Sequence, residues 1–123
     1  MSRTNLQDMT VQQLVQRFLA IALEQHEALS LDEYERYNRL YDQMAAVTVE
    51  LRARAGDRRK ALVPLLDHSN ARVRLKAAIN TLAVAPEAAR RTLQAIVDRK
   101  EYPEAADARG MLRALERGTY SPT

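Results

Sequence analysis

A nine-residue pattern occurs twice in this chain, with the second copy 31 positions after the first. The copies cover residues 59–67 and 90–98. Each begins with two basic residues, places apolar residues at its fourth, seventh and eighth positions, and ends with aspartate. A repeat of this length with helical spacing is typical of stacked helical hairpins and not of a closed catalytic fold. We therefore expect an all-α chain.

The composition agrees with this fold class. Hydrophobic residues make up 46% of the 123 residues, and only three are glycine. A chain of this length can bury one core, so we expect a single domain over residues 1–123. Cysteine is absent, which excludes disulfides, thiolate metal sites and thiol nucleophiles. Neither a signal-peptide pattern nor a membrane-spanning apolar run is visible, and we expect a cytoplasmic protein that does not bind membranes.

Apolar spacing and helix-end signals predict about six helices. A long N-terminal hairpin covers residues 10–56, with Thr10 and Gln13 capping its first helix and a capping box at residues 30–33 starting its second. Pro64 lies inside the third helix, which it should bend. Four shorter helices are expected: one at about 57–66, one that follows the N-cap Asn70 and ends at about 82 or 84, one opened by Pro86 that continues to about 100, and one opened by Pro103 and closed by Gly118. A tail follows over 118–123.

A family resemblance rests on residues 65–74, which read Leu-Leu-Asp-His-Ser-Asn-Ala-Arg-Val-Arg, and on the alanines that follow at 77 and 78. This segment resembles a HEAT repeat, with its proline-bent first helix and the Val-Arg-x-x-Ala-Ala opening of its second. The resemblance covers residues 57–117 and implies two HEAT-like hairpins in a right-handed α-α superhelix. His68 stands where that family usually has an aspartate pairing with the arginine matched by Arg74.

The whole chain is also similar to a small bacterial family of HEAT-like proteins of unknown function. In that family a long N-terminal hairpin precedes a Leu-Leu-Asp-His turn, matched here by residues 65–68, and a Val-Arg-Leu-Lys-Ala-Ala helix, matched by residues 73–78. The similarity implies a fold and carries no activity.

Catalytic patterns are absent from the sequence. A helical zinc site would require a second histidine four residues after His26, but that position holds serine. The other histidine, His68, lies in a turn. No serine sits in a Gly-x-Ser-x-Gly elbow. We predict no catalytic residue, no cofactor and no metal, and thus a protein that is not an enzyme. A small enzyme with an unrecognised carboxylate site is the weakest alternative.

Charge is divided unevenly along the chain. Residues 1–50 hold four basic and eight acidic residues, a balance of −4, while residues 51–123 hold 15 basic and eight acidic residues, a balance of +7. Such asymmetry suggests that one part of the molecule attracts an anionic partner. Solvated helix surfaces of different composition would show the same asymmetry.

The basic halves of the duplicated pattern are candidate binding residues. Arg59 with Lys60 and Arg90 with Arg91 hold equivalent places in two hairpins, and packed helices lie about 8 to 10 Å apart. Stacking should therefore bring the pairs onto one outer face. An acidic protein partner, a phosphate backbone and simple solvation are all compatible with that face. Further basic residues extend the face at Arg58, Arg99 and Lys100.

Two tyrosines are further candidates for partner contact. Tyr34 and Tyr41 lie seven residues apart beside the expected core stripe of the second helix, a placement found both in interfaces and in intramolecular packing. Together these features predict a non-catalytic protein-binding module with an acidic protein partner. A bacterial immunity protein that neutralises a toxin is the concrete form of this hypothesis. Nucleic-acid backbone binding through the basic face is the alternative.

Overall fold

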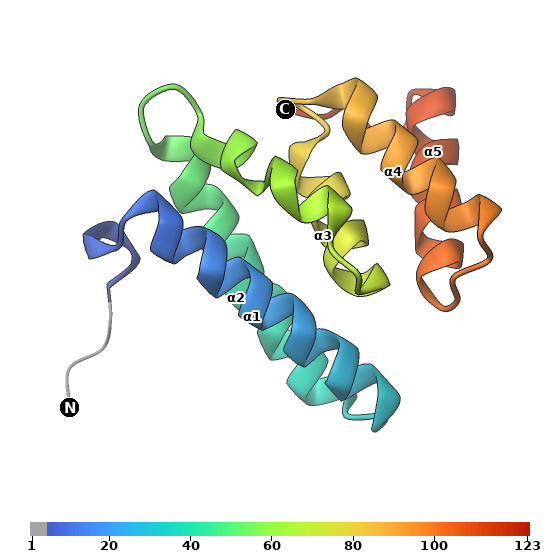
Figure 1. Cartoon of the computed structure of the whole chain (residues 1–123), viewed down its shortest axis with the longest axis horizontal. Coiled ribbons are helices and arrows are strands. Elements are labelled where there is room, and N and C mark those ends of the chain that lie inside the picture. Colours follow the sequence, from blue (N-terminus) through green and yellow to red (C-terminus); the bar gives the residue numbers. More distant parts are fainter. Residues whose placement is uncertain (1–4) are drawn as a thin grey trace. The chain divides into compact units, whose positions relative to one another are not determined.

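The computed structural model describes residues 5–123, and these residues form helices without any strand (Figure 1). The predicted all-α class of sequential hairpins is confirmed. No helix in this described range is long and apolar enough to cross a membrane. The α-helices are α1 (Val11–Ser30), α2 (Tyr34–Ala53), α3 (Ala71–Thr81), α4 (Pro86–Asp98) and α5 (Glu104–Arg117), and the 3-10 helices are η1 (Leu6–Asp8) and η2 (Arg58–Asp67).

The chain divides into two compact units, Met1–Ala61 and Leu62–Thr123. The first contains the predicted N-terminal hairpin, and the second contains α3, α4 and α5. A single domain and a superhelical stack of all the hairpins therefore stay predictions.

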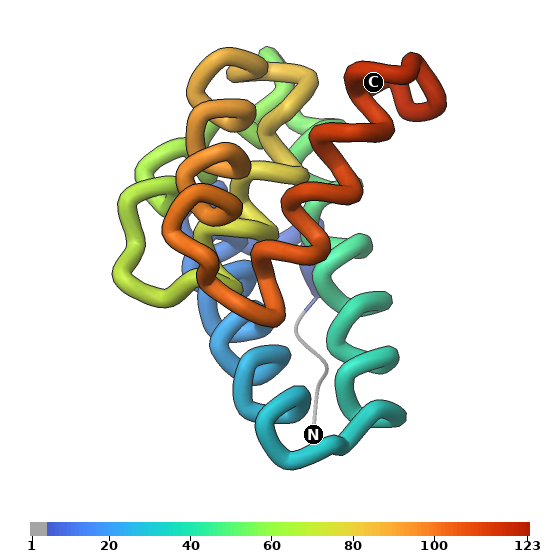
Figure 2. Tube along the Cα trace, turned by 90° about the vertical axis from the view of Figure 1, so that its right-hand side faces the viewer, coloured from blue at the N-terminus to red at the C-terminus, as the bar shows by residue number. Residues whose placement is uncertain are grey.

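In the first unit, α1 and α2 lie side by side as an antiparallel hairpin (Figures 1 and 2). Apolar residues recur every three or four positions along both helices, so each helix has one apolar stripe to bury. The buried apolar side chains are Leu14, Phe18, Ile21, Ala22 and Ala28 of α1 and Leu40, Met44, Val47 and Leu51 of α2.

The two predicted capping boxes of the hairpin have opposite outcomes. At the start of α1, Thr10 Oγ1 accepts from the Gln13 amide at 3.1 Å and Gln13 Oε1 accepts from the Thr10 amide at 2.9 Å, which confirms the first. The second is wrong, because α1 continues through Ser30 and the N-cap of α2 is Glu33, which makes no side-chain cap.

Backbone hydrogen bonds explain why the second capping box does not form. Asp32 adopts a left-handed conformation with φ of 54°, and the Glu33 amide donates to the Ala28 carbonyl at 2.8 Å. The Asp32 amide donates to the Leu29 carbonyl at 3.2 Å, which completes a Schellman motif at the end of α1. Ser30 lies inside this motif and is therefore not available to cap α2.

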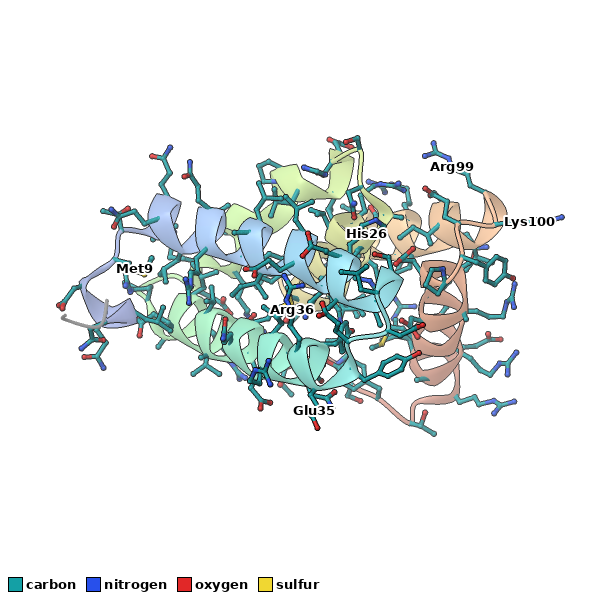
Figure 3. All side chains as sticks on the ribbon, turned by 90° about the horizontal axis from the view of Figure 1, so that it is seen from below. Met9, His26, Glu35, Arg36, Arg99 and Lys100 are labelled. Carbon is teal, nitrogen blue, oxygen red and sulfur yellow. The ribbon has the colours of Figure 1, made fainter. Side chains whose placement is uncertain are left out.

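Arg36 of α2 lies between the two helices (Figure 3). It donates to Glu27 of α1 at 2.8 Å and to Glu33 at 2.9 Å, while Glu24 of α1 lies 3.4 Å away. These carboxylates raise the pKa of the guanidinium. Arg36 thus links the two helices through Glu24 and Glu27 of α1.

Arg54, at the end of α2, holds the N-terminal segment of the described chain. Its Nη2 donates to the carbonyls of Leu6 at 3.1 Å and Met9 at 2.8 Å, and its Nε donates to Glu50 at 2.7 Å. Glu50 lies four residues before Arg54, the spacing at which side chains on one side of a helix meet. One side chain thus ties η1 to α2.

Replacing Arg54 by glutamine should release η1 from α2. Hydrogen bonds to a charged donor contribute about 1.5 to 3 kcal/mol, so amide exchange at Asp8 and Met9 should accelerate about ten-fold or more. Exchange within the middle of α1 should not change. The matched control is Arg39→Gln, an exposed arginine of α2. Equal protection of Asp8 and Met9 in both variants would contradict the anchoring role of Arg54.

The second unit begins within η2, and here a prediction fails. The third helix was expected to be a bent α-helix, whereas residues 58–67 form a 3-10 helix with Pro64 inside it. Proline has no N–H to donate, which interrupts α-helical bonding at this position. Three other end signals are confirmed: Asn70 caps α3, Pro86 opens α4, and Gly118 closes α5 with φ of 72°. Pro103 precedes α5 as its N-cap and does not lie in its first turn.

In this unit α3 packs against α4, and α4 packs against α5; Figure 2 shows the last two side by side in orange and red. The apolar half of the duplicated pattern contributes to the core, because Leu62 and Leu93 are both fully buried. Residues 72–78 of α3 are buried without interruption, including three charged side chains. A helix buried on all sides needs partners for those charges.

A buried ion pair joins α3 to α5 and was not predicted. Arg72 donates to Oε2 of Glu104 from Nη2 at 2.8 Å and from Nε at 3.0 Å, and the two side chains are 1% and 5% exposed. Asp107, which is mostly exposed, lies 3.4 Å from Nη1 of the same arginine. The guanidinium is therefore buried together with a carboxylate of the opposite charge.

Candidate partner-binding cleft

A cleft of about 610 Å³ lies within the second unit, between η2, the turn that follows it, and α4. We call it the α4 cleft. Its small and apolar lining residues are Val63, Leu66, Ala88, Thr92 and Ala95. Its polar and charged lining residues are Asp67, His68, Ser69, Arg74, Arg91 and Arg99. Three arginines against one aspartate give this lining a net positive charge.

The turn at one end of the cleft is held by Asn70. Its Oδ1 accepts from the amides of Arg72 at 2.8 Å and Val73 at 3.2 Å, which caps α3. The Asn70 amide in turn donates to Nδ1 of His68 at 3.0 Å. In the neutral imidazole the proton then resides on Nε2. The ring of His68 is thus oriented by the backbone, with a donor at its other nitrogen.

Arg74 connects this turn to the segment that follows α4. Its Nε donates to the His68 carbonyl at 2.7 Å, and its two terminal nitrogens donate to Oε1 and Oε2 of Glu101 at 2.7 and 2.6 Å. This bidentate pair raises the pKa of Arg74 and lowers the pKa of Glu101. The acidic partner of Arg74 therefore comes from the following helical hairpin, while His68 contributes only its backbone oxygen.

Acidification should weaken this connection between the turn and Glu101. A carboxyl whose pKa is lowered by folding adds stability above its unfolded pKa, here the ordinary value of 4.5, and that stability is lost as pH falls through the folded pKa. Glu101→Gln should therefore lose less stability than the wild type between about pH 5 and pH 2. Urea unfolding followed by circular dichroism measures the difference.

The control for this pH series is Glu116→Gln, an exposed glutamate of α5. It should keep the acid dependence of the wild type. If Glu101→Gln shows the same loss of stability on acidification as the wild type, the pair with Arg74 does not contribute in the way that its geometry indicates.

Arg91 and Arg99 are the two arginines of the cleft whose side chains can still bind a carboxylate of another molecule. Both are exposed, and within residues 5–123 neither forms an ion pair or a side-chain hydrogen bond. The charge of Arg99 also lowers the pKa of Glu101, although less than the hydrogen bonds from Arg74 do. Figure 3 shows Arg99 and Lys100 at the end of α4 pointing in different directions, and only Arg99 lines the cleft.

The residues proposed from the duplicated pattern have different surroundings. Arg59 is 9% exposed and clamps Asp57, donating from Nε at 2.9 Å and from Nη2 at 2.6 Å, which lowers the pKa of Asp57. Lys60 is exposed. Arg90 is also exposed but does not line the α4 cleft, whereas Arg91 does. The first pair belongs to the first unit and the second pair to the second, so a shared face stays a prediction.

Both predicted tyrosines are exposed on α2. Tyr34 is 61% and Tyr41 is 56% exposed, so neither completes the core. The hydroxyl of Tyr34 donates to Oδ1 of Asp32 at 3.0 Å, and this bond raises the pKa of Tyr34. The tyrosines lie in the first unit and are not part of the α4 cleft. Their role in partner contact stays a prediction.

The cleft itself was not predicted, and neither was the pairing of its lining residue Arg74 with Glu101. One pattern in the sequence could have indicated the cleft. Ala88, Ala95 and Arg99 recur at helical spacing on one side of α4, and small residues near basic ones leave space at the surface of a helix. Metal ligation has no support in the described range, since residues 5–123 contain no group of three His, Asp or Glu side chains that could hold an ion.

Comparisons with known proteins agree with this fold. A family model described as a domain of unknown function (DUF2019) matches residues 12–116. The crystal structure of the protein RPA1889 from Rhodopseudomonas palustris CGA009 matches with a TM-score of 0.95 and 45% sequence identity, covering 98% of this chain and 100% of that chain. No curated protein matches the chain. The comparisons thus identify a family and a bacterial homologue.

Proposed function

The chain belongs to the DUF2019 family, and from this premise we propose that it is a non-catalytic protein-binding module whose partner is an acidic protein. The observation that carries the proposal is the α4 cleft, in which Arg91 and Arg99 stand beside small and apolar residues. A protein partner supplies both carboxylates for the arginines and apolar side chains for the small and apolar lining residues of the cleft. Helical-repeat proteins commonly bind partners through such extended faces.

Neutralisation of a toxin by a cognate immunity protein is the concrete form of this function that we propose. Small size, the helical-hairpin build and a bacterial homologue support it. Nucleic-acid backbone binding is the alternative. Its affinity grows with the number of phosphates that basic side chains neutralise, so it requires many lysines or arginines along one surface. The α4 cleft offers two arginines that have no ion-pair partner among residues 5–123, a number better matched to a few carboxylates.

The test starts from the product of the neighbouring gene, purified and titrated into the full chain by calorimetry. We expect binding that the double variant Arg91→Glu, Arg99→Glu abolishes and that Arg90→Glu, outside the cleft, retains. Labelled DNA and RNA are titrated in parallel at about 50 and about 200 mM salt. Salt-dependent nucleic-acid binding that is lost in the same double variant, with no protein binding, would replace the proposal by its alternative.

A further inference from the structure

The geometry of the α4 cleft points to a specific partner chemistry. We infer that the cleft binds an extended acidic segment of the pattern acidic-x-apolar-x-acidic, with one carboxylate at Arg91 and the other at Arg99. The inference rests on the proposed function, and it states what the acidic partner must present. A peptide alone is enough to test it, so the two proposals can fail separately.

The spacing of the two arginines sets the spacing of the acids. Arg91 and Arg99 are eight residues apart along the chain of α4 and its C-cap, which corresponds to about 12 Å along a helix axis. An extended segment advances about 3.3 Å per residue, so its first and fifth residues are about 13 Å apart. Alternate side chains of such a segment point to the same side. The first, third and fifth side chains therefore face α4 together.

The part of the cleft between the arginines suits an apolar side chain. Thr92 and Ala95 of α4 lie between the two basic positions in sequence, and Val63 and Leu66 of η2 also line the cleft. Small residues on α4 leave space above the helix, which the third side chain of the segment can fill. A volume of about 610 Å³ lies within the range of about 300 to 1,000 Å³ that is usual for ligand sites.

The pairing of Arg74 with Glu101 keeps Arg99 available. Glu101 follows Arg99 by two residues and would be its nearest acidic neighbour in sequence after α4, but each of its oxygens accepts a bond from Arg74, at 2.7 and 2.6 Å. Arg74 thus acts as a positioning residue. His68 lines the same cleft, and its Nε2 donor is available to a carbonyl of the bound segment because Nδ1 accepts from Asn70.

The probe is the peptide acetyl-Glu-Ser-Leu-Ser-Glu-amide, titrated into the isotope-labelled full chain and followed by amide chemical shifts. We expect shifts in α4 and in residues 67–70. Arg91→Gln and Arg99→Gln should each weaken binding about five-fold, the upper range for an exposed ion pair. The matched controls Arg90→Gln and Lys100→Gln remove the same charge from exposed neighbours outside the cleft, and each should weaken binding less than about two-fold.

Two comparison peptides test the pattern. The glutamine version, acetyl-Gln-Ser-Leu-Ser-Gln-amide, should bind at least about ten-fold more weakly, because it loses both ion pairs. Acetyl-Glu-Ser-Leu-Glu-Ser-amide places its acids on opposite sides of an extended chain and should bind as weakly as a peptide with one acid. Equal binding of this second peptide and the probe would overturn the proposed spacing.

Other results would overturn the inference in distinguishable ways. Equal weakening by Arg90→Gln and Arg91→Gln would indicate general charge attraction instead of a site. An absence of peptide shifts in α4 would remove the cleft as the binding place. An oligothymidylate that displaces the peptide and binds more tightly would favour phosphate over carboxylate. If the partner protein still binds the Arg91→Gln, Arg99→Gln double variant, the protein-binding function stands and the inference about the cleft is wrong.

Discussion

Replacing Glu104 by glutamine is expected to lower the free energy of unfolding by about 3 to 5 kcal/mol. The carboxylate accepts two hydrogen bonds from Arg72, at 2.8 and 3.0 Å, and both side chains are at least nine-tenths buried. The substitution leaves the guanidinium of Arg72 buried without its main counter-charge, and the buried charge cannot regain the hydration that it has in water. Urea unfolding followed by circular dichroism measures the loss.

Two further variants separate the buried pair from general effects on α5. The double variant Arg72→Met, Glu104→Leu removes both charges and should recover most of the stability, because apolar replacement of a buried ion pair is often neutral or stabilising. Asp107→Asn, at the exposed second partner of Arg72, should cost less than about 1 kcal/mol. A loss below about 1 kcal/mol for Glu104→Gln would contradict the role assigned to the pair.

The second large effect is expected from Leu93→Ala, with a loss of about 2 to 5 kcal/mol. Leu93 is the first apolar residue of the second copy of the duplicated pattern and is fully buried. Its truncation removes apolar contacts and leaves a cavity that close-packed neighbours fill only in part. Thermal and urea unfolding both report the change.

The control comes from the same copy of the pattern. Arg90 is exposed, so Arg90→Gln should change stability by no more than about 0.5 kcal/mol. Leu62, the equivalent of Leu93 in the first copy and also fully buried, should behave like Leu93 when changed to alanine. A similar cost for Arg90→Gln and Leu93→Ala would show that the pattern does not separate core from surface.

Most of the helices could be predicted from the sequence because their signals are local. The caps at Thr10 and Asn70, the proline that opens α4 and the glycine that closes α5 each act within a few residues of their own position. Apolar spacing depends only on the helical period. For the same reason the buried positions of α2 could be predicted from the order of its residues alone.

The errors arise where the backbone or a distant residue decides. The motif that ends α1 uses backbone bonds and a left-handed aspartate, and neither is visible in side-chain patterns. Arg59 is a local exception: it was expected on an open face, but the carboxylate of Asp57, only two residues away, accepts two hydrogen bonds from its side chain. Arg74, which lines the α4 cleft, pairs with Glu101, which is 27 residues away. Contacts of this length depend on packing and not on local spacing.

The anchor of the N-terminal segment has a consequence for the order in which the protein acquires its structure during synthesis. Leu6 accepts its bond from a residue that is 48 positions further along the chain. At about 5 to 20 residues per second, translation reaches Arg54 roughly 2 to 10 seconds after it has passed Leu6. Throughout that interval η1 lacks its anchor, although the residues of the first turns of α1 have already been translated. The Arg54 anchor of η1 can therefore form only after both helices of the hairpin have been translated.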